Sequence, residues 1–488
     1  MKKTINNILA GSMIAAVCAT VVSCSDELNS LPSQSKVDGN LVVDQKSAVI
    51  ALNGVYYTYA MCKTDNYGVK STGCSRFYEV MPADLAGTTV YYQGPYLYEE
   101  HDVSSMESGG NNLWGTYYGT VNAANAVIEQ VSNASDSYFQ GNKKNEILGE
   151  AHCMRALAFY NLLRYFGYSW DISSPYGILL RTEKSTASNL LVKRSSVKDS
   201  YGQILSDIDF AITNAPVDND NFYVSKWFAK GLKARVLMMR GEGDDYENAA
   251  SLCTDIIENG PYQLEDNYDD IFHKNGLSSS EVIFGITPKP NQTDVYESYF
   301  YRAKPQYYPT NNMLALYDGD PRKSQMYKEI IDDSGEEPVI VYAICKHLHP
   351  EKMIYDDLEE SQYQMRLSEI YLLKAEALAR MGNMHVPEAG QLLKTVMSKA
   401  GITDFSSVDA AATSEAMLAL IFREAIKNLS FECGLEHDIM LRFPESITLQ
   451  FNPVYENRQY DVFPIPTDEF KYNSALSASD QNPGYSAS

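Results

Sequence analysis

Basic side chains are scarce in this chain. Its 488 residues include 40 Lys and Arg against 63 Asp and Glu, a formal net charge of −23. Nucleic-acid binders need clustered Lys and Arg to neutralise phosphates, so the composition argues against that class of protein. Hydrophobic residues make up 44% of the chain, which is enough for a buried core and excludes a wholly disordered protein.

Long apolar runs are absent after residue 22. The run at residues 8–22 follows a basic start and ends in small residues, which predicts a secretory signal peptide over residues 1–23 and not a membrane-spanning helix. The ending VVSC at residues 21–24 resembles a bacterial lipobox, whose Cys becomes the acylated first residue of the mature protein. We therefore expect a lipid anchor on Cys24; ordinary cleavage near Ser23, leaving Cys24 free, is the alternative.

Cysteine pairs of the CxxC kind are also absent, so neither a zinc ribbon nor a thioredoxin-like redox pair is indicated. Two of the eight Cys lie in the signal peptide and at the anchor. Cys62 and Cys74 share one polar segment and are candidates for a loop disulfide in an exported protein. Three others fall among apolar helical positions and are interpreted as small core residues: Cys153, Cys253 and Cys433.

Motifs of catalysis and nucleotide binding are absent as well. The chain has no HExxH, GxSxG, GxxxxGK or GxGxxG. His347-Leu348-His349 offers two metal ligands without a matching third, so no metal site is predicted. Glycoside hydrolysis needs two carboxylates at a set distance, and a sequence with 63 acids does not reveal which of them lie that far apart. A glycosidase therefore stays an open alternative. We expect a protein without catalytic residues, cofactor or metal.

Tryptophan is rare and tyrosine is abundant, with 3 Trp against 36 Tyr. Trp114, Trp170 and Trp227 fall beside or inside predicted helices and are interpreted as packing residues. Eleven Tyr lie in residues 56–118 and seven in residues 288–327, two long segments without clean periodicity. Tyrosine rings stack on sugar faces or peptide side chains, and their hydroxyls fix orientation. The candidate ligand-binding residues are Tyr67, Tyr91, Tyr92, Tyr96, Tyr296, Tyr299, Tyr301, Tyr307 and Tyr308.

Helical periodicity dominates the remaining sequence. Apolar positions predict a helix from residue 148 to a stop at Gly167, and another over 194–212 with Ser195 or Ser196 as its N-cap. Two helix pairs follow, each joined by a Gly-containing turn and resembling tetratricopeptide units; residues 280–287 are predicted as a strand. The pairs comprise 226–241 with 246–264, and 366–383 with 387–401.

Several stretches resemble the SusD/RagB family of nutrient-binding outer-membrane lipoproteins of Bacteroidetes. The matching stretches are NLWGTYYGTVNAANAVIEQV (112–131), GEAHCMRALAFYNLLRYFG (149–167), RLSEIYLLKAEALARMG (366–382), FREAIKNLSFECGLEHDIMLRF (422–443), VFPIPTDEF (462–470) and SDQNPGY (479–485). Ser25-Asp26-Glu27 similarly resembles the acidic tag that exports such lipoproteins to the cell surface. The chain departs from the family pattern at Asn428, at 432–437 and at Tyr168-Ser169-Trp170, the last in a loop that is a candidate to face the ligand.

The resemblance implies a mainly α fold, a tetratricopeptide-like helix-turn-helix scaffold with long irregular insertions and few short strands. It implies one SusD-like domain over residues 24–488, with an N-terminal part about 24–220 and a RagB/SusD part about 221–488. It also implies ligand contacts in 60–112 and 288–325. The expected function is capture of an oligosaccharide at the cell surface and delivery to a TonB-dependent SusC-like outer-membrane transporter, without cleavage.

Three alternatives remain open at this stage. The same fold binds peptides in RagB-like relatives, a surface glycosidase or peptidase would cleave its ligand, and a purely structural protein would use only the helix pairs. Scarcity of Trp in the two long segments slightly favours a peptide or a small glycan over flat polysaccharide faces.

Overall fold

A computed structural model describes residues 42–60, 80–92, 107–286, 305–332, 338–347, 361–453 and 458–487. Residues 42–488 form one compact unit. The signal peptide (1–23) and the acidic tag (25–27) lie outside the described residues, as do Cys24, Cys62, Cys74, Tyr67, Tyr96, Tyr296, Tyr299, Tyr301, Leu348 and His349. Within the described residues, no helix is long and apolar enough to cross a membrane.

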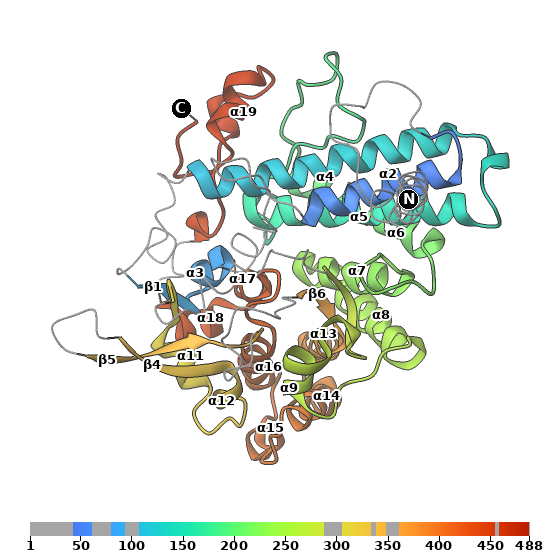
Figure 1. The fold of residues 1–488 in the computed structure, drawn as a ribbon. Coiled ribbons are helices and arrows are strands. Elements are labelled where there is room, and N and C mark those ends of the chain that lie inside the picture. The colour runs from blue at the N-terminus through green and yellow to red at the C-terminus, as the bar shows by residue number, and fades with distance from the viewer. Residues whose placement is uncertain are drawn as a thin grey trace, which may run out of the picture. The chain divides into compact units, whose positions relative to one another are not determined.

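Helices dominate the described chain, as the periodicity predicted. One group packs side by side in chain order (Figure 1): α2 (Gln45–Ala60), α4 (Glu107–Asn133), α5 (Lys143–Phe166) and α6 (Val197–Asn214). A second group contains α7 (Lys226–Arg240), α8 (Asp245–Asn259), α13 (Leu367–Arg380), α14 (Val386–Lys399), α16 (Ser414–Leu429) and α17 (Leu435–Arg442). The α6–α7 contact joins the two groups.

Several of the predicted helix boundaries are confirmed by their local chemistry, although α5 begins at Lys143, five residues before the predicted start. Gly167 follows the last residue of α5, and the Ser196 side chain accepts from the Asp199 amide at the start of α6. Gly241 ends α7 in the left-handed region, with φ of 63°. The pairs α7/α8 and α13/α14 pack against each other through α8 and α13, so two units far apart in sequence form one scaffold.

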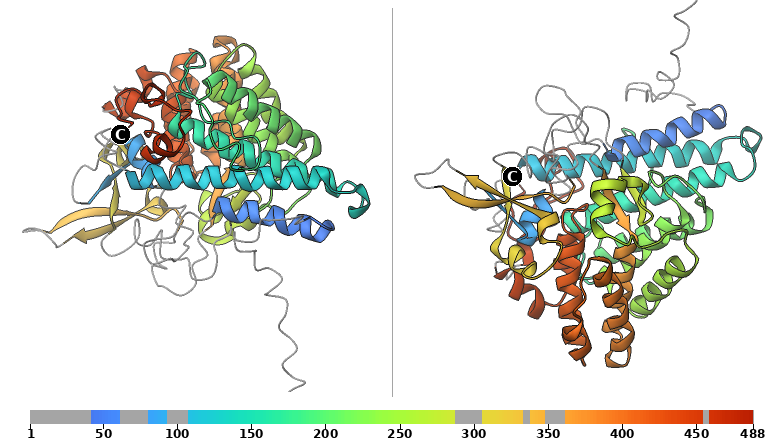
Figure 2. Two further views of the ribbon diagram at one scale, coloured as in Figure 1. Left: turned by 90° about the horizontal axis from the view of Figure 1, so that it is seen from above. Right: turned by 60° about the horizontal axis from the view of Figure 1, so that its bottom comes forward.

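Short strands and small helices make up the irregular part. Three antiparallel two-stranded ladders occur in the described residues, and the predicted strand at 280–287 is confirmed as β2. The pairs are β1 (Thr89–Tyr91) with β3 (Tyr307–Pro309), β2 (Val282–Ile286) with β6 (Gln362–Arg366), and β4 (Tyr327–Asp332) with β5 (Val339–Ile344). Figure 2 shows the β4–β5 hairpin extending away from the helices.

The remaining short helices connect these elements. They are α3 (Met81–Ala86), α9 (Tyr268–Asp270), α11 (Asn311–Leu316), α12 (Lys323–Met326), α15 (Ser406–Ala410), α18 (Glu445–Phe451) and α19 (Thr467–Tyr472). Cys153, Cys253 and Cys433 are buried, as predicted for core residues. Trp114 and Trp227 are also buried, whereas Trp170 is partly buried and stacks on Tyr168 at 4.9 Å between ring centroids.

Candidate functional site

The β1–β3 ladder brings the two tyrosine-rich segments together. Tyr91 lies opposite Tyr307, Val90 lies opposite Tyr308, and the Tyr92 amide donates to the Gln306 carbonyl at 2.9 Å. Four of the nine candidate binding residues therefore lie on or next to one short ladder, which we call the tyrosine platform: Tyr91, Tyr92, Tyr307 and Tyr308.

The four rings of the platform differ in exposure. Tyr307 is only 4% exposed, Tyr91 and Tyr308 are half-buried, and Tyr92 is 48% exposed. The Tyr91 ring lies 5.3 Å from the Tyr307 ring and 4.8 Å from the Tyr92 ring, measured between centroids. Tyr307 is thus the buried member of the platform, Tyr91 packs between Tyr307 and Tyr92, and the Tyr92 ring is exposed to solvent. A solvent-facing ring held by packed neighbours is suited to stacking on a planar or puckered apolar face.

Local chemistry at the end of α3 positions β1. Gly87 ends α3 in the left-handed region, with φ of 74°, and its amide donates to the Asp84 carbonyl. A Cβ on Gly87 would collide with the Asn452 side chain, so both the conformation and the close approach require glycine. The Thr88 amide and hydroxyl both donate to the Ala83 carbonyl at 2.9 Å. The chain therefore turns directly from α3 into the strand.

A single threonine joins β3 to β1 and to the next helix. The Thr310 amide donates to the Thr88 carbonyl at 3.0 Å, and its hydroxyl donates to the Gly87 carbonyl at 2.8 Å. The same hydroxyl accepts from the Met313 amide at 3.2 Å, which caps α11. The register of the platform is thus fixed by hydrogen bonds at its edge.

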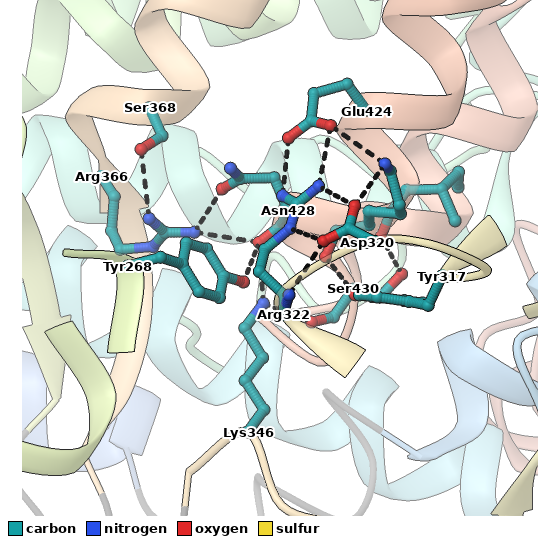
Figure 3. A network of polar contacts seen from close by, with 12 residues as sticks. Tyr268, Tyr317, Asp320, Arg322, Lys346, Arg366, Ser368, Glu424, Asn428 and Ser430 are labelled. Atoms are coloured by element: carbon teal, nitrogen blue, oxygen red, sulfur yellow. Dashed lines mark hydrogen bonds and ion pairs between the residues drawn. The ribbon is translucent and has the colours of Figure 1, made fainter. Parts of the chain in front are cut away.

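A buried ion network fastens the segment after α11 to helix α16 (Figure 3). Arg322 is fully buried and donates to the Asp320 carboxylate at 2.7 and 2.9 Å and to the Glu424 carboxylate at 2.6 and 2.9 Å. Lys427 adds a 2.6 Å contact to Asp320. Burial raises the pKa of Asp320, but hydrogen bonds and charge from Arg322 and Lys427 outweigh it and hold that pKa at about 2.

A second buried network fastens the residues after β5 to the turn between α16 and α17. Lys346 donates to the carbonyls of Asn428 and Ser430 at 2.8 and 2.7 Å and pairs with Glu432 at 2.5 Å. Arg366 pairs with Glu432 at 2.7 Å and donates to Asn428 Oδ1 at 2.9 Å. Burial lowers the pKa of Lys346 to about 8 against the attraction of Glu432.

The departure from the family pattern at Asn428 has a structural explanation in this network. Its neutral amide oxygen supplies an acceptor to Arg366, whose other partners include the carboxylates of Glu281 and Glu432. An acid at position 428 would place a third carboxylate in the same buried space, and burying an additional charge is costly.

The sequence offered these tyrosines as candidates but did not predict what positions them. The pairing of β1 with β3 was not predicted, although TVYY at 89–92 and YYP at 307–309 are rich in strand-forming residues. The network residues Asp320, Arg322 and Lys346 were also missed, because their partners lie on other elements. His347, considered as a metal ligand, is buried, with Nε2 2.8 Å from the Phe431 carbonyl. In the described residues, no group of three or more candidate ligands could hold a metal ion.

Two family models match the chain. A model described as "Starch-binding associating with outer membrane" matches residues 34–238, and a model described as "SusD family" matches residues 291–485. Together these matches cover most of the chain.

Curated relatives and solved structures agree with these matches. A SusD-like protein of Bacteroides ovatus is 23% identical over 283 residues, 56% of this chain and 48% of that protein. A SusD-like protein of Formosa agariphila is 25% identical over 275 residues, 55% of this chain and 50% of that protein. The chain thus spans about half the length of the curated relatives it matches.

Solved structures resemble the chain over most of its length. A SusD superfamily protein from Bacteroides thetaiotaomicron has a TM-score of 0.73 at 23% identity, covering 90% of this chain and 100% of that one. A putative sugar binding protein from Bacteroides vulgatus has a TM-score of 0.71 at 20% identity, covering 92% and 100%. At these identities the likeness establishes the fold, which confirms the expected mainly α, tetratricopeptide-like architecture.

Proposed function

The chain belongs to the SusD/RagB family, and on that premise we propose that it is a nutrient-binding protein that captures an oligosaccharide at the tyrosine platform. The observation that carries the proposal is the pairing of β1 with β3, because it joins tyrosines from two distant segments at one short ladder with Tyr92 outermost. The family description of starch binding, and the sugar-binding name of one structural relative, support a carbohydrate ligand.

We propose in addition that the ligand is delivered uncleaved to a TonB-dependent SusC-like outer-membrane transporter. In this proposal residues 1–23 are a signal peptide, Cys24 carries the lipid anchor, and the protein faces the cell exterior on the outer membrane. Residues 24–488 then form one SusD-like domain, with an N-terminal part about 24–220 and a RagB/SusD part about 221–488. The family description, which mentions association with the outer membrane, supports this location.

Calorimetric titration of the protein with a panel of oligosaccharides and peptides tests the ligand. We expect Tyr92→Ala to weaken oligosaccharide binding about five- to hundred-fold, because aromatic stacking is worth roughly 1–3 kcal/mol. The matched control is Tyr138→Ala, in the η4 turn (Asp136–Tyr138) between α4 and α5, whose side chain is similarly exposed at 43%. Its affinity should equal that of the unmodified protein.

Three outcomes would redirect the proposal. Binding of peptides and of no oligosaccharide would assign the RagB-like function. The platform has no exposed Trp, which is compatible with a peptide ligand. Release of shortened oligosaccharide during the titration would identify an enzyme and contradict the binding function. Equal affinity of Tyr92→Ala and the unmodified protein would remove the ligand from the platform.

A further inference from the structure

A second surface, unconnected with the tyrosine platform, combines exposed apolar and basic side chains. Leu190 and Leu191 are adjacent and are 49% and 58% exposed, and Tyr472 at the end of α19 is 70% exposed. Lys193 and Lys471 beside them are also exposed, and the Lys471 ammonium lies 5.0 Å from the centroid of the Tyr472 ring. We call these five residues the apolar–basic patch. Large apolar side chains are rarely exposed together without a partner.

Hydrogen bonds hold the two halves of the patch together. Arg181 donates from Nη1 to the Leu190 carbonyl at 2.7 Å and from Nη2 to Glu469 Oε1 at 2.6 Å. Asn473 Nδ2 donates to the Val192 carbonyl at 2.8 Å. The loop that carries both leucines is therefore fastened to α19, and Figure 1 shows this loop and α19 on the same side of α4. The leucines are presented by a fixed backbone.

The charge of this loop is opposite to that of the whole chain. Residues 181–198 carry five basic residues and one acidic residue, whereas the chain carries 40 basic and 63 acidic residues. Arg181 is paired with Glu469, and Arg194 is partly buried and donates to backbone carbonyls, so the bases that this segment presents to solvent are Lys193, Lys198 and the half-buried Lys184. Three acids lie near the patch. Glu469 is paired with Arg181, and the exposed carboxylates of the patch are those of Glu183 and Asp468. An anionic surface would thus approach this face in preference to the rest of the molecule.

We propose that the apolar–basic patch binds an anionic lipid surface. Membrane-interface contacts typically combine three kinds of side chain. Leucines insert below the lipid headgroups, a tyrosine lies at headgroup level, and lysines reach the lipid phosphates. The patch has no stacked aromatic pair for a sugar face. Each Leu buried in the acyl region removes apolar area from water, and each Lys near the surface adds electrostatic attraction. This contact orients the protein on the membrane independently of any acyl anchor and of sugar binding.

Flotation with vesicles of pure phosphatidylglycerol and of pure phosphatidylcholine tests the proposal. The protein used is residues 42–488, because this compact unit contains the whole described core. We expect binding to phosphatidylglycerol that salt weakens, and little binding to phosphatidylcholine. The double variant Leu190→Ser/Leu191→Ser should reduce binding about tenfold or more, and Lys193→Glu/Lys471→Glu should reduce it on phosphatidylglycerol.

The β4–β5 hairpin offers a matched control. Ile331 and Ile340 lie opposite each other and are 71% and 64% exposed, yet they belong to a different surface. Ile331→Ser/Ile340→Ser should leave vesicle binding unchanged. Equal loss of binding in the leucine and isoleucine variants, or no loss in the leucine variant, would overturn the proposal. A concentration-dependent dimer that only the leucine variant abolishes, without vesicle binding, would make a second copy of the chain the occupant and would also overturn it.

Discussion

At the scale of single residues, Glu150 shows how burial alters a carboxyl group. Its side chain is 3% exposed on α5 and accepts from the Tyr56 hydroxyl at 2.6 Å. Burial raises the pKa of Glu150 to about 7, although the hydrogen bond from Tyr56 acts in the opposite direction. A carboxyl whose pKa is higher in the folded state contributes stability that is fully present below its unfolded pKa and is lost as the pH rises through its folded pKa.

This environment predicts the pH dependence of stability. Replacing Glu150 with Gln keeps an acceptor for Tyr56 and removes the titration. Between about pH 5 and about pH 8 we expect the free energy of unfolding to fall further in the unmodified protein than in Glu150→Gln, by on the order of 3 kcal/mol. Urea unfolding at both pH values measures it. Parallel pH profiles for the two proteins would show that Glu150 titrates normally.

Single residues also mark where sequence reasoning stops. Tyr92 and Tyr307 were equivalent candidates in the sequence, and both lie beside another Tyr. Their exposed fractions of 48% and 4% follow from the side of the β1–β3 ladder on which each ring packs. Alternation along a strand predicts which side chains share a face of the ladder. It does not predict which face packs against the core, because that depends on the elements packed beneath the ladder.

At the scale of secondary-structure elements, the buried networks hold the irregular part on the helices. Arg322 follows α11, and both Asp320 and Glu424 depend on it for charge neutralisation. Arg322→Met should lower the free energy of unfolding by about 3–5 kcal/mol, since it leaves two carboxylates in a buried space with only Lys427. Chemical denaturation followed by circular dichroism measures the loss.

The neighbouring residue provides the control for that change. Lys323 pairs with Asp318 at the surface, where side-chain exposures are 38% and 72%. Exposed pairs contribute little because water screens them, so Lys323→Met should leave the unfolding midpoint nearly unchanged. Similar losses in both variants would mean that the Arg322 pairs are not what fastens this segment.

Elements differ in how far the sequence predicts them. Helices such as α6 follow from local signals, an apolar period and the Ser196 cap, which act within a few residues. The β1–β3 ladder joins residues more than two hundred positions apart, and three-residue strands carry too short a pattern to identify their partner. The tetratricopeptide-like pairs were predicted individually; the α8–α13 contact that joins them was not.

At the scale of the whole molecule, the proposed anchor determines where the protein resides. Acyl chains on Cys24 would hold the protein on a membrane, since each buried methylene contributes roughly 0.8 kcal/mol. Cys24→Ala should therefore move the protein from the membrane fraction to the soluble fraction of cells, as read by fractionation and immunoblotting. Unchanged fractionation of Cys24→Ala would contradict lipidation at this residue.

The two strands of the tyrosine platform are synthesised at different times. The Thr310 hydroxyl bonds to Gly87, 223 residues earlier in the chain, so β1 leaves the ribosome long before β3 exists. At typical rates of synthesis this interval is roughly ten to forty seconds. During it, the helices from α4 to α8 are already complete, while the strand that will carry Tyr91 has no second strand. The helices from α4 to α8 are thus synthesised before the platform can form, whereas α13 and α14, the second pair of the scaffold, follow it.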